Sequence, residues 1–193
     1  MRPSLPPSYF DALYQAQPDP WSFETSPYEQ AKYSATLAAL PKAQYRSAFE
    51  IGCSIGVLTE RLAQRCERLL AVDVAERALG RARERCCHLP HVQCELRRVP
   101  EEFPTETFDL VLVSEVGYYW SWTDLARAQT CILQQLEPGG HLLLIHWVHF
   151  AVDYPLNADE VHESFLGLAQ GLQHLGGRRE PDYRLDLFER VMP

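Results

Sequence analysis

The chain has 193 residues, of which 46% are hydrophobic, and its formal net charge is -8. This length suits one well-buried domain and is short for two of ordinary size. The negative charge opposes the attraction that supplies most nucleic-acid affinity, so we expect no nucleic-acid partner. No segment approaches the ~20 apolar residues of a membrane span, and no signal peptide is apparent, so we expect a cytoplasmic protein with no membrane partner.

The N-terminal stretch, residues 1–47, is punctuated by prolines and contains no alternating apolar stretch, so no strand is expected there. The sequence Ser26-Pro27-Tyr28-Glu29 is typical of a helix start, with a serine cap and proline at the first helical position. Leu40-Pro41 ends this predicted helix, and its apolar face includes Tyr33 and Leu37.

From residue 48 onward, short apolar runs alternate with helical segments, a pattern that favours a parallel sheet wrapped by helices. The runs are AFEIGC, LLAVDV, HVQCEL, FDLVLVSE and LLLIHWV. Helices are predicted near residues 56–66, 75–87 and 122–136, and a Pro138-Gly139-Gly140 turn is predicted to lead into the fifth strand. Asn157 to Glu160 caps a further helix that ends at Gly171, and the tail LQHLGGRREPDYRLDLFERV reads as an antiparallel hairpin.

Two clusters of polar residues invite a functional interpretation. Arg77, Arg81 and Arg85 share one face of a predicted helix; they could bind an anion, but we favour a solvated helix face. His146 and His149 lie three residues apart, and on an extended strand such residues face opposite sides. The six cysteines form no C-x-x-C pair. We therefore predict no metal ion.

The segment FEIGCSIGVLTERLA fits two incompatible chemistries, because Ser54 completes a G-x-S-x-G motif within an E-x-G-x-x-x-G loop. As a nucleophile elbow it would need several earlier strands and a second oxyanion donor upstream, and neither is present in the sequence. A dinucleotide G-x-G-x-x-G loop fails at Ser54 and Val57. What remains is a loop where Gly52 and Gly56 let backbone approach a ligand, followed by Asp73, whose carboxylate suits a ribose diol.

Glu50, Gly52, Gly56 and Asp73, followed by FDLVLVSEV and LEPGGHLLL, occur in the order and spacing of class I S-adenosylmethionine-dependent methyltransferases, which residues 48–148 resemble. The resemblance implies an α/β, Rossmann-like, seven-stranded, mostly parallel sheet with an antiparallel last strand and helices on both faces. It also implies a single domain over residues 1–193, with a helical lid at 1–47 and the core at 48–193.

The same resemblance implies S-adenosyl-L-methionine as cofactor, with Glu50 to Gly56 on its methionine part, Asp73 on its ribose, and Ser114 to Tyr119 as the floor of the transfer site. The implied cofactor contacts are Trp21, Tyr28, Lys32, Tyr33, Glu50, Gly52, Ser54, Gly56, Asp73, Val74, Val99, Ser114, Glu115 and Val116. Ser54 replaces the middle glycine of the usual loop. The segment LRRVPEEF leaves the adenine contact open among Arg98, Val99, Glu101 and Glu102.

A narrower resemblance rests on PDPWSFETSPYEQAKYSATLAALP, EIGCSIGVLTERLA, SEVGYYW, HW at 146–147, DEVH at 159–162 and DYRLDLFER. These segments are similar to nodulation methyltransferases of the NodS type, which N-methylate a glucosaminyl amine on a chitin-like oligosaccharide. The acceptor implied is an amino sugar, an oligosaccharide or another small molecule; the oligomeric state is left open. A small-molecule O-methyltransferase and a non-catalytic S-adenosylmethionine-binding protein are the alternatives.

Amine methylation needs a base or a site that selects the neutral amine, because a protonated amine has no lone pair. We predict Glu115 and His146 as catalytic residues and weigh His162 as a third candidate base. Aromatic rings at the carboxyl end of a strand suit sugar faces and the sulfonium cation. The predicted substrate contacts are Tyr118, Tyr119, Trp147 and His162. Nucleobase or glutamine methylation is disfavoured, since SEVGYY stands where those enzymes carry an N-P-P-Y-like motif.

Overall fold

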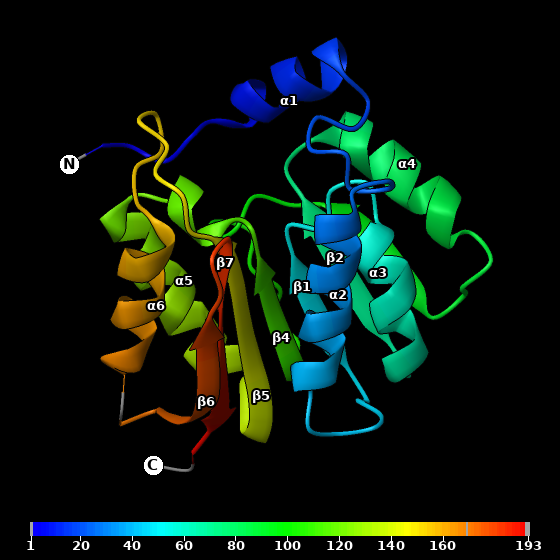
Figure 1. Cartoon of the computed structure of the whole chain (residues 1–193). Helices are drawn as coiled ribbons and strands as arrows, with labels where there is room; N and C mark the ends of the chain where they lie inside the picture. The colour runs from blue at the N-terminus through cyan, green and yellow to red at the C-terminus, as the bar shows by residue number, and fades with distance from the viewer. Residues whose placement is uncertain (1, 169, 192–193) are drawn as a thin grey trace. The chain divides into compact units, whose positions relative to one another are not determined.

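The computed structural model describes residues 2–168 and 170–191, and Figure 1 shows how their helices and strands run. The chain divides into two compact units. One consists of Pro6–Arg98, and the other combines Met1–Leu5 with Val99–Pro193. The prediction of a single domain with a lid at residues 1–47 stays a prediction.

The unit Pro6–Arg98 contains three parallel strands and the helices around them. Its elements are α1 (Pro7–Ala16), α2 (Pro27–Ala39), β1 (Ala48–Ile51), α3 (Val57–Leu62), the 3-10 turn η1 (Ala63–Arg65), β2 (Leu69–Asp73), α4 (Glu76–Cys86) and β3 (Val92–Leu96). β2 pairs in parallel with β1 on one side and β3 on the other. All four residues of β1 are buried, as expected for a central parallel strand covered on both faces.

The predicted start of α2 is confirmed. The Ser26 hydroxyl accepts a hydrogen bond from the Glu29 backbone N–H, Pro27 occupies the first turn, and the helix stops at Ala39. Helix α1 was not predicted, although Phe10, Leu13 and Tyr14 have the spacing of one helix face. The prolines around this short helix favoured a loop, so its apolar spacing was not recognised as helical.

In its described residues the second unit has four strands and two α-helices. Its elements are β4 (Phe108–Ser114), the 3-10 turn η2 (Gly117–Tyr119), α5 (Trp122–Gln135), β5 (Leu136–Trp147), α6 (Ala158–Leu166), β6 (Leu172–Arg179) and β7 (Tyr183–Arg190). β4 and β5 are parallel, whereas β7 runs antiparallel to both β5 and β6. α5 and α6 lie beside each other in Figure 1, and the Gln129 amide donates to the Ser164 hydroxyl between them.

The second unit confirms the C-terminal hairpin and corrects two boundaries. Asn157 and Glu160 form a reciprocal capping box at the start of α6, as the sequence predicted, but the helix ends at Leu166 rather than Gly171. β5 begins at Leu136, so Pro138-Gly139-Gly140 lies within the bounds of the strand, where Gly139 has a left-handed φ of 73°. The register between β4 and β5 shifts there, from Phe108 opposite Leu136 to Leu110 opposite His141, so β5 accommodates three extra residues without ending the pairing.

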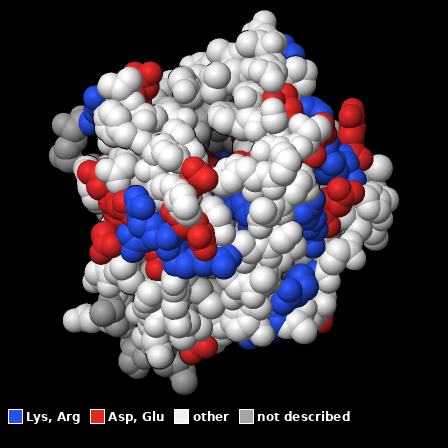
Figure 2. Space-filling view, in the orientation of Figure 1, with Lys and Arg blue, Asp and Glu red and all other residues white. Residues whose placement is uncertain are grey.

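The strand order β3-β2-β1-β4-β5-β7-β6 confirms the predicted seven-stranded, mostly parallel sheet. No helix among the described residues is long and apolar enough to cross a membrane. On the face drawn in Figure 2, basic and acidic side chains lie in mixed clusters, and the residues coloured there form no extended basic area.

Candidate active site

The loop after β1 is shaped by three residues with left-handed backbone. Gly52, Ser54 and Gly56 have φ values of 88°, 51° and 79°. Gly56 is required by space as well as by conformation, because an added Cβ would lie 2.9 Å from Ala82 Cα. The loop therefore packs tightly on α4 and presents backbone rather than side chains at its turns.

Asp73 ends β2 beside this loop and is held by backbone donors. Its Oδ2 accepts from the Ser54 N–H at 2.9 Å, and its Oδ1 accepts from the Ala75 N–H at 3.0 Å. Burial raises the pKa of Asp73, and these hydrogen bonds oppose that shift. A carboxylate has about four acceptor positions, so an oriented Asp73 can still accept two hydroxyl donors from a diol.

Glu50 in β1 is a buried carboxylate with unmet hydrogen-bonding capacity. Its exposed fraction is 1%, and neither carboxylate oxygen has a hydrogen-bond partner among the described residues; the nearby Thr59 hydroxyl is in the same condition. Burial raises the pKa of Glu50 to about 7, with Thr59 opposing the shift and Asp73 adding to it. An unpartnered buried acid is costly, and a cationic ligand would satisfy it.

The predicted lid residues lie on or before α2. Lys32 is buried, pairs with Glu29 at 2.9 Å and lies over the Tyr28 ring at 4.8 Å. Lys32 thus has an ion-pair partner on its own helix, and its predicted contact with the cofactor carboxylate stays a prediction. Tyr33 is buried beneath the Arg61 guanidinium, 5.4 Å from the ring centre.

Tyr14 in α1 is a site residue that the sequence analysis missed. Its hydroxyl shares a hydrogen bond with the Ser54 hydroxyl, and its ring meets the Trp21 ring edge-on at 5.8 Å. Burial, then the nearby Asp73 carboxylate, raises the pKa of Tyr14, so the phenol stays neutral. Recognition of α1 from its apolar spacing would have placed Tyr14 on the buried face.

Of the three arginines singled out on α4, Arg77 is exposed, whereas Arg81 and Arg85 are half-buried and contact other segments of the same unit. Arg81 pairs with Glu24 at 2.8 Å and donates to the Pro18 carbonyl at 2.7 Å. Arg85 also pairs with Glu24 and donates to the Ile55 carbonyl at 3.0 Å. Arg81 and Arg85 thus tether the segment between α1 and α2, and Arg85 tethers the glycine-rich loop as well.

In the other unit, Glu115 follows β4 in a left-handed conformation with φ of 58°. Its Oε2 accepts hydrogen bonds from the Tyr118 hydroxyl and, at 2.9 Å, from the Trp147 backbone N–H. Glu115 is half-buried, whereas the Tyr118 and Tyr119 rings are buried. These two donors therefore fix the orientation of the Glu115 carboxylate.

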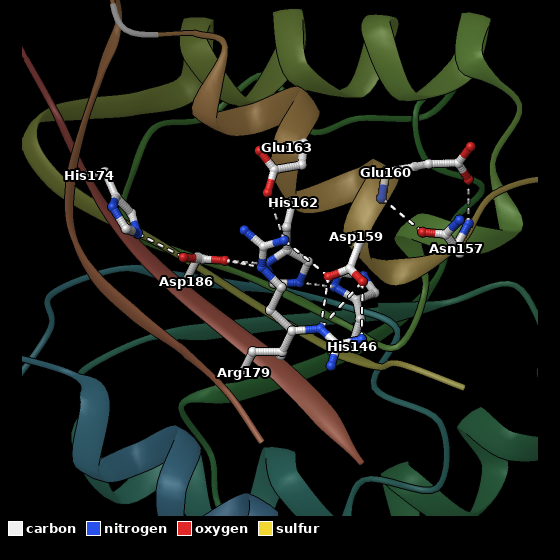
Figure 3. Close-up of polar contacts among 10 residues, drawn as sticks. His146, Asn157, Asp159, Glu160, His162, Glu163, His174, Arg179 and Asp186 are labelled. Carbon is white, nitrogen blue, oxygen red and sulfur yellow. Dashed lines mark hydrogen bonds and ion pairs between the residues drawn. The ribbon is translucent and has the colours of Figure 1, made fainter. Parts of the chain in front are cut away.

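His146 and His162 lie in the interior of this unit, where their rings meet (Figure 3). Both are 0% exposed. His146 accepts from the Gly117 N–H at Nε2 and contacts His162 through Nδ1, while the other nitrogen of His162 contacts Asp186. Every ring nitrogen of this pair is engaged in the protein interior, so direct contact with an acceptor would require these contacts to change. The predicted roles of His146 as a base and of His162 as a substrate contact stay predictions.

The roles of the remaining predicted cofactor contacts stay predictions. Val74 directly follows β2, Val116 lies two residues after β4, and both are half-buried. Val99 is buried, and Ser114 is the last residue of β4. Among the described residues no group of three or more histidine, cysteine or acidic side chains could hold a metal ion.

The strand order and the glycine-rich loop followed by Asp73 define a class I S-adenosylmethionine-dependent methyltransferase fold. The family model described as Nodulation protein S (NodS) matches residues 13–146. The chain belongs to the NodS family.

Individual relatives agree with this assignment. Nodulation protein S of Rhizobium tropici is 35% identical over 132 residues, which span 66% of this chain and 55% of that protein. The protein of the same name from Bradyrhizobium diazoefficiens is 42% identical over 105 residues, 52% of this chain and 49% of that protein. The chain thus spans about half the length of these curated relatives.

Solved structures extend the similarity over more of the fold. N-methyltransferase NodS from Bradyrhizobium japonicum WM9, in complex with S-adenosylhomocysteine, matches with a TM-score of 0.83 and 28% identity, covering 94% of this chain and 97% of that one. A putative methyltransferase from Pseudomonas syringae matches with a TM-score of 0.75 and 39% identity, covering 84% and 99% of the two chains.

Proposed function

We propose that this chain transfers a methyl group from S-adenosyl-L-methionine to the free amine of an amino sugar or chitin-like oligosaccharide. The observation that supports this choice of cofactor is the buried Glu50 carboxylate, whose oxygens have no hydrogen-bond partner among the described residues. The observation that favours an amine is the oriented Glu115 carboxylate beside the aromatic turn η2. Membership of the NodS family supports both.

The residues of the loop unit fit this cofactor. Glu50 would pair with the ammonium of its methionine part, and Asp73 would accept the two ribose hydroxyls. Gly52 and Gly56 allow the backbone to approach because their left-handed conformations turn the loop without side chains. When bound, the cofactor supplies a methyl group already activated as part of a sulfonium.

Glu115 is the residue that we propose to contact the acceptor. The Tyr118 hydroxyl and the Trp147 N–H hold one of its oxygens in place, so the carboxylate needs little reorganisation to accept an N–H from an amine. It can take the amine proton, or select the neutral amine by accepting a hydrogen bond. Tyr118 stays a neutral donor, since burial and then the Glu115 carboxylate raise its pKa well above the ordinary value.

The acceptor is tested by measuring S-adenosylhomocysteine release with glucosamine oligosaccharides, their N-acetylated counterparts and small phenols. We expect turnover only with free amines. Glu115→Gln should slow transfer by ~10²- to 10⁴-fold, as for a lost acid or base. Glu137→Gln is the matched control: Glu137 is half-buried in the same unit and accepts from the Thr107 hydroxyl. Turnover of phenols alone would establish an O-methyltransferase instead.

The cofactor site has its own test, proton release on binding. Near pH 7 about half of the Glu50 carboxyls are protonated in the free protein, because their pKa is about 7. A bound ammonium favours the charged carboxylate, so binding should release roughly half a proton at this pH. Calorimetry of S-adenosylhomocysteine binding in buffers of different ionisation enthalpy measures this release. Glu50→Gln should abolish it; equal release from both proteins would contradict the assignment.

A further inference from the structure

The second unit contains a buried line of hydrogen bonds that connects β7 to the turn after β4. The Gly117 N–H donates to His146 Nε2 at 3.0 Å, His146 Nδ1 lies 3.0 Å from His162 Nε2, and His162 Nδ1 lies 2.7 Å from Asp186 Oδ2. The three side chains come from β5, α6 and β7. Each has an exposed fraction of at most 4%.

The direction of every hydrogen bond in this line is determined. A backbone N–H can only donate, so His146 Nε2 carries no proton, and the neutral ring has its proton on Nδ1. That proton is donated to His162 Nε2, which leaves the His162 proton on Nδ1, where it is donated to Asp186. An additional proton on either ring would place two donors face to face.

The surroundings of Asp186 maintain this arrangement. Burial opposes its ionisation, but the hydrogen bonds from His162 and Arg184 outweigh that effect and lower the pKa of Asp186. Burial lowers the pKa of His162, although Asp186 opposes the shift. The His174 ring nitrogen lies 2.7 Å from the other Asp186 oxygen. A charged carboxylate facing a neutral imidazole is thus the expected state.

At its other end the line meets the segment that carries Glu115. An added Cβ on Gly117 would lie 2.8 Å from His146 Nε2 and 2.7 Å from Val161 Cγ1, so this turn is packed directly on the histidine. Tyr118, the next residue, places its ring edge-on to His146 at 5.3 Å and donates to Glu115.

We propose that His146, His162 and Asp186 form a positioning relay that holds the Gly117 amide and thereby sets the Glu115–Tyr118 segment for methyl transfer. This inference rests on the proposed function, because the Glu115 segment matters only if it serves the acceptor. His162 and Asp186 lie outside residues 13–146, the region that the family model matches. The relay ends on a backbone amide, so it orients the site and does not carry the acceptor proton away.

Enzyme kinetics tests the positioning role. His146→Phe removes the acceptor for Gly117, and we expect kcat to fall ~10²-fold, the cost of a misplacement of about 1 Å, with KM for the cofactor unchanged. His146→Gln puts an amide oxygen near the Nε2 position and should restore most of kcat. His141→Phe is the matched control, because His141 is also a buried histidine of β5. An unchanged kcat in His146→Phe, or no rescue by glutamine, would overturn the proposal.

Gly117→Ala keeps the proposal testable if His146→Phe does not fold. The new methyl group would push against His146, so kcat should fall to a similar extent; parental kcat would contradict the relay. Gly117 is not one of the glycines with a left-handed φ, so an alanine at this position adds no backbone strain.

A second readout does not depend on activity. Nitrogen-15 spectra of the parental protein should show His146 and His162 as Nδ1–H tautomers, and the Gly117 amide should be protected from hydrogen exchange. That protection should persist in His146→Gln and be lost in His146→Phe. An Nε2–H tautomer of His146 would overturn the relay. If no amine is methylated while these spectra are as expected, the proposed function fails and the relay geometry stands.

Discussion

The two units of the molecule hold their buried carboxylates in opposite ways. In the unit with the glycine-rich loop, Glu50 has no hydrogen-bond partner among the described residues, and its pKa is raised to about 7. In the unit with β4 to β7, Asp186 is also buried but interacts with His162, His174 and Arg184, and its pKa is lowered.

The difference is in the source of the hydrogen-bond partners. Asp186 receives its partners from the protein itself, whereas the partner that we propose for Glu50 is a bound ligand. A buried acid without a partner is costly, and its retention is explained if a bound cation completes it. A buried acid with several donors contributes rigidity and can orient neighbouring groups before any ligand arrives. The following substitutions test this comparison.

The largest effect is expected at Asp186. Asp186→Ala should lower the free energy of unfolding by about 3 to 5 kcal/mol, because it removes a buried carboxylate that His162, His174 and Arg184 share. Asp182→Ala is the matched control: Asp182 pairs with His149 at 2.7 Å, but both are about half exposed. This surface pair should contribute about 0 to 1 kcal/mol. Equal effects in urea unfolding would contradict the comparison.

Asp73 should show the next largest effect, on ligand binding. Asp73→Ala removes the acceptor proposed for the ribose diol, and two lost hydrogen bonds to a charged group should weaken S-adenosylhomocysteine binding by ~10²-fold or more. Calorimetry measures the affinity, with Glu84→Ala, an exposed acid on α4, as control. Unchanged affinity in Asp73→Ala would remove the basis for the cofactor site.

Glu50→Gln should stabilise the ligand-free protein at alkaline pH. The folded-state pKa of Glu50, about 7, lies above its ordinary value of 4.5, so the folded state binds the proton more tightly. The corresponding stability is present below about pH 4.5 and is lost as pH rises through 7. Glutamine stays neutral, so at pH 9 the variant should exceed the parent by roughly 1 to 3 kcal/mol, and the two should converge at pH 4. A less stable variant at pH 9 would show that Glu50 has a partner in the folded protein.

The sequence predicted those parts of the fold that depend on local patterns. The cap at Ser26, the capping box at Asn157 and the five parallel-type strands follow from short segments whose residue types act on their own backbone. The family resemblance added the strand order and the loop. Pro138-Gly139-Gly140 was placed wrongly because a turn signal also fits an irregularity inside a paired strand.

The relay could not be predicted because it is made by tertiary structure. His146 and His162 are 16 residues apart, and His162 and Asp186 are 24 apart, so no sequence spacing connects them. Only the packing of α6 against β5 and β7 brings the rings together. Histidines at strand ends resemble exposed bases in the sequence, and burial decides between the two roles.

The smallest effect is expected at Ser54, which tests whether the loop unit binds a ligand or carries a nucleophile. Its left-handed φ of 51° would also suit the strained serine of an esterase. Its hydroxyl, however, forms a hydrogen bond with the hydroxyl of Tyr14, and this phenol stays neutral and cannot act as a base. Ser54→Ala should therefore retain methyl transfer within about fivefold, the loss of one neutral hydrogen bond of ~1 kcal/mol or less.

Tyr14→Phe removes the same hydrogen bond from the other side and serves as the matched control. If the two hydroxyls act only on each other, the double variant should behave like either single variant, since the second substitution has nothing left to remove. Additive losses would instead mean that each hydroxyl meets the ligand separately. Covalent labelling of Ser54 by a fluorophosphonate, absent in Ser54→Ala, would contradict the ligand-binding role of the loop.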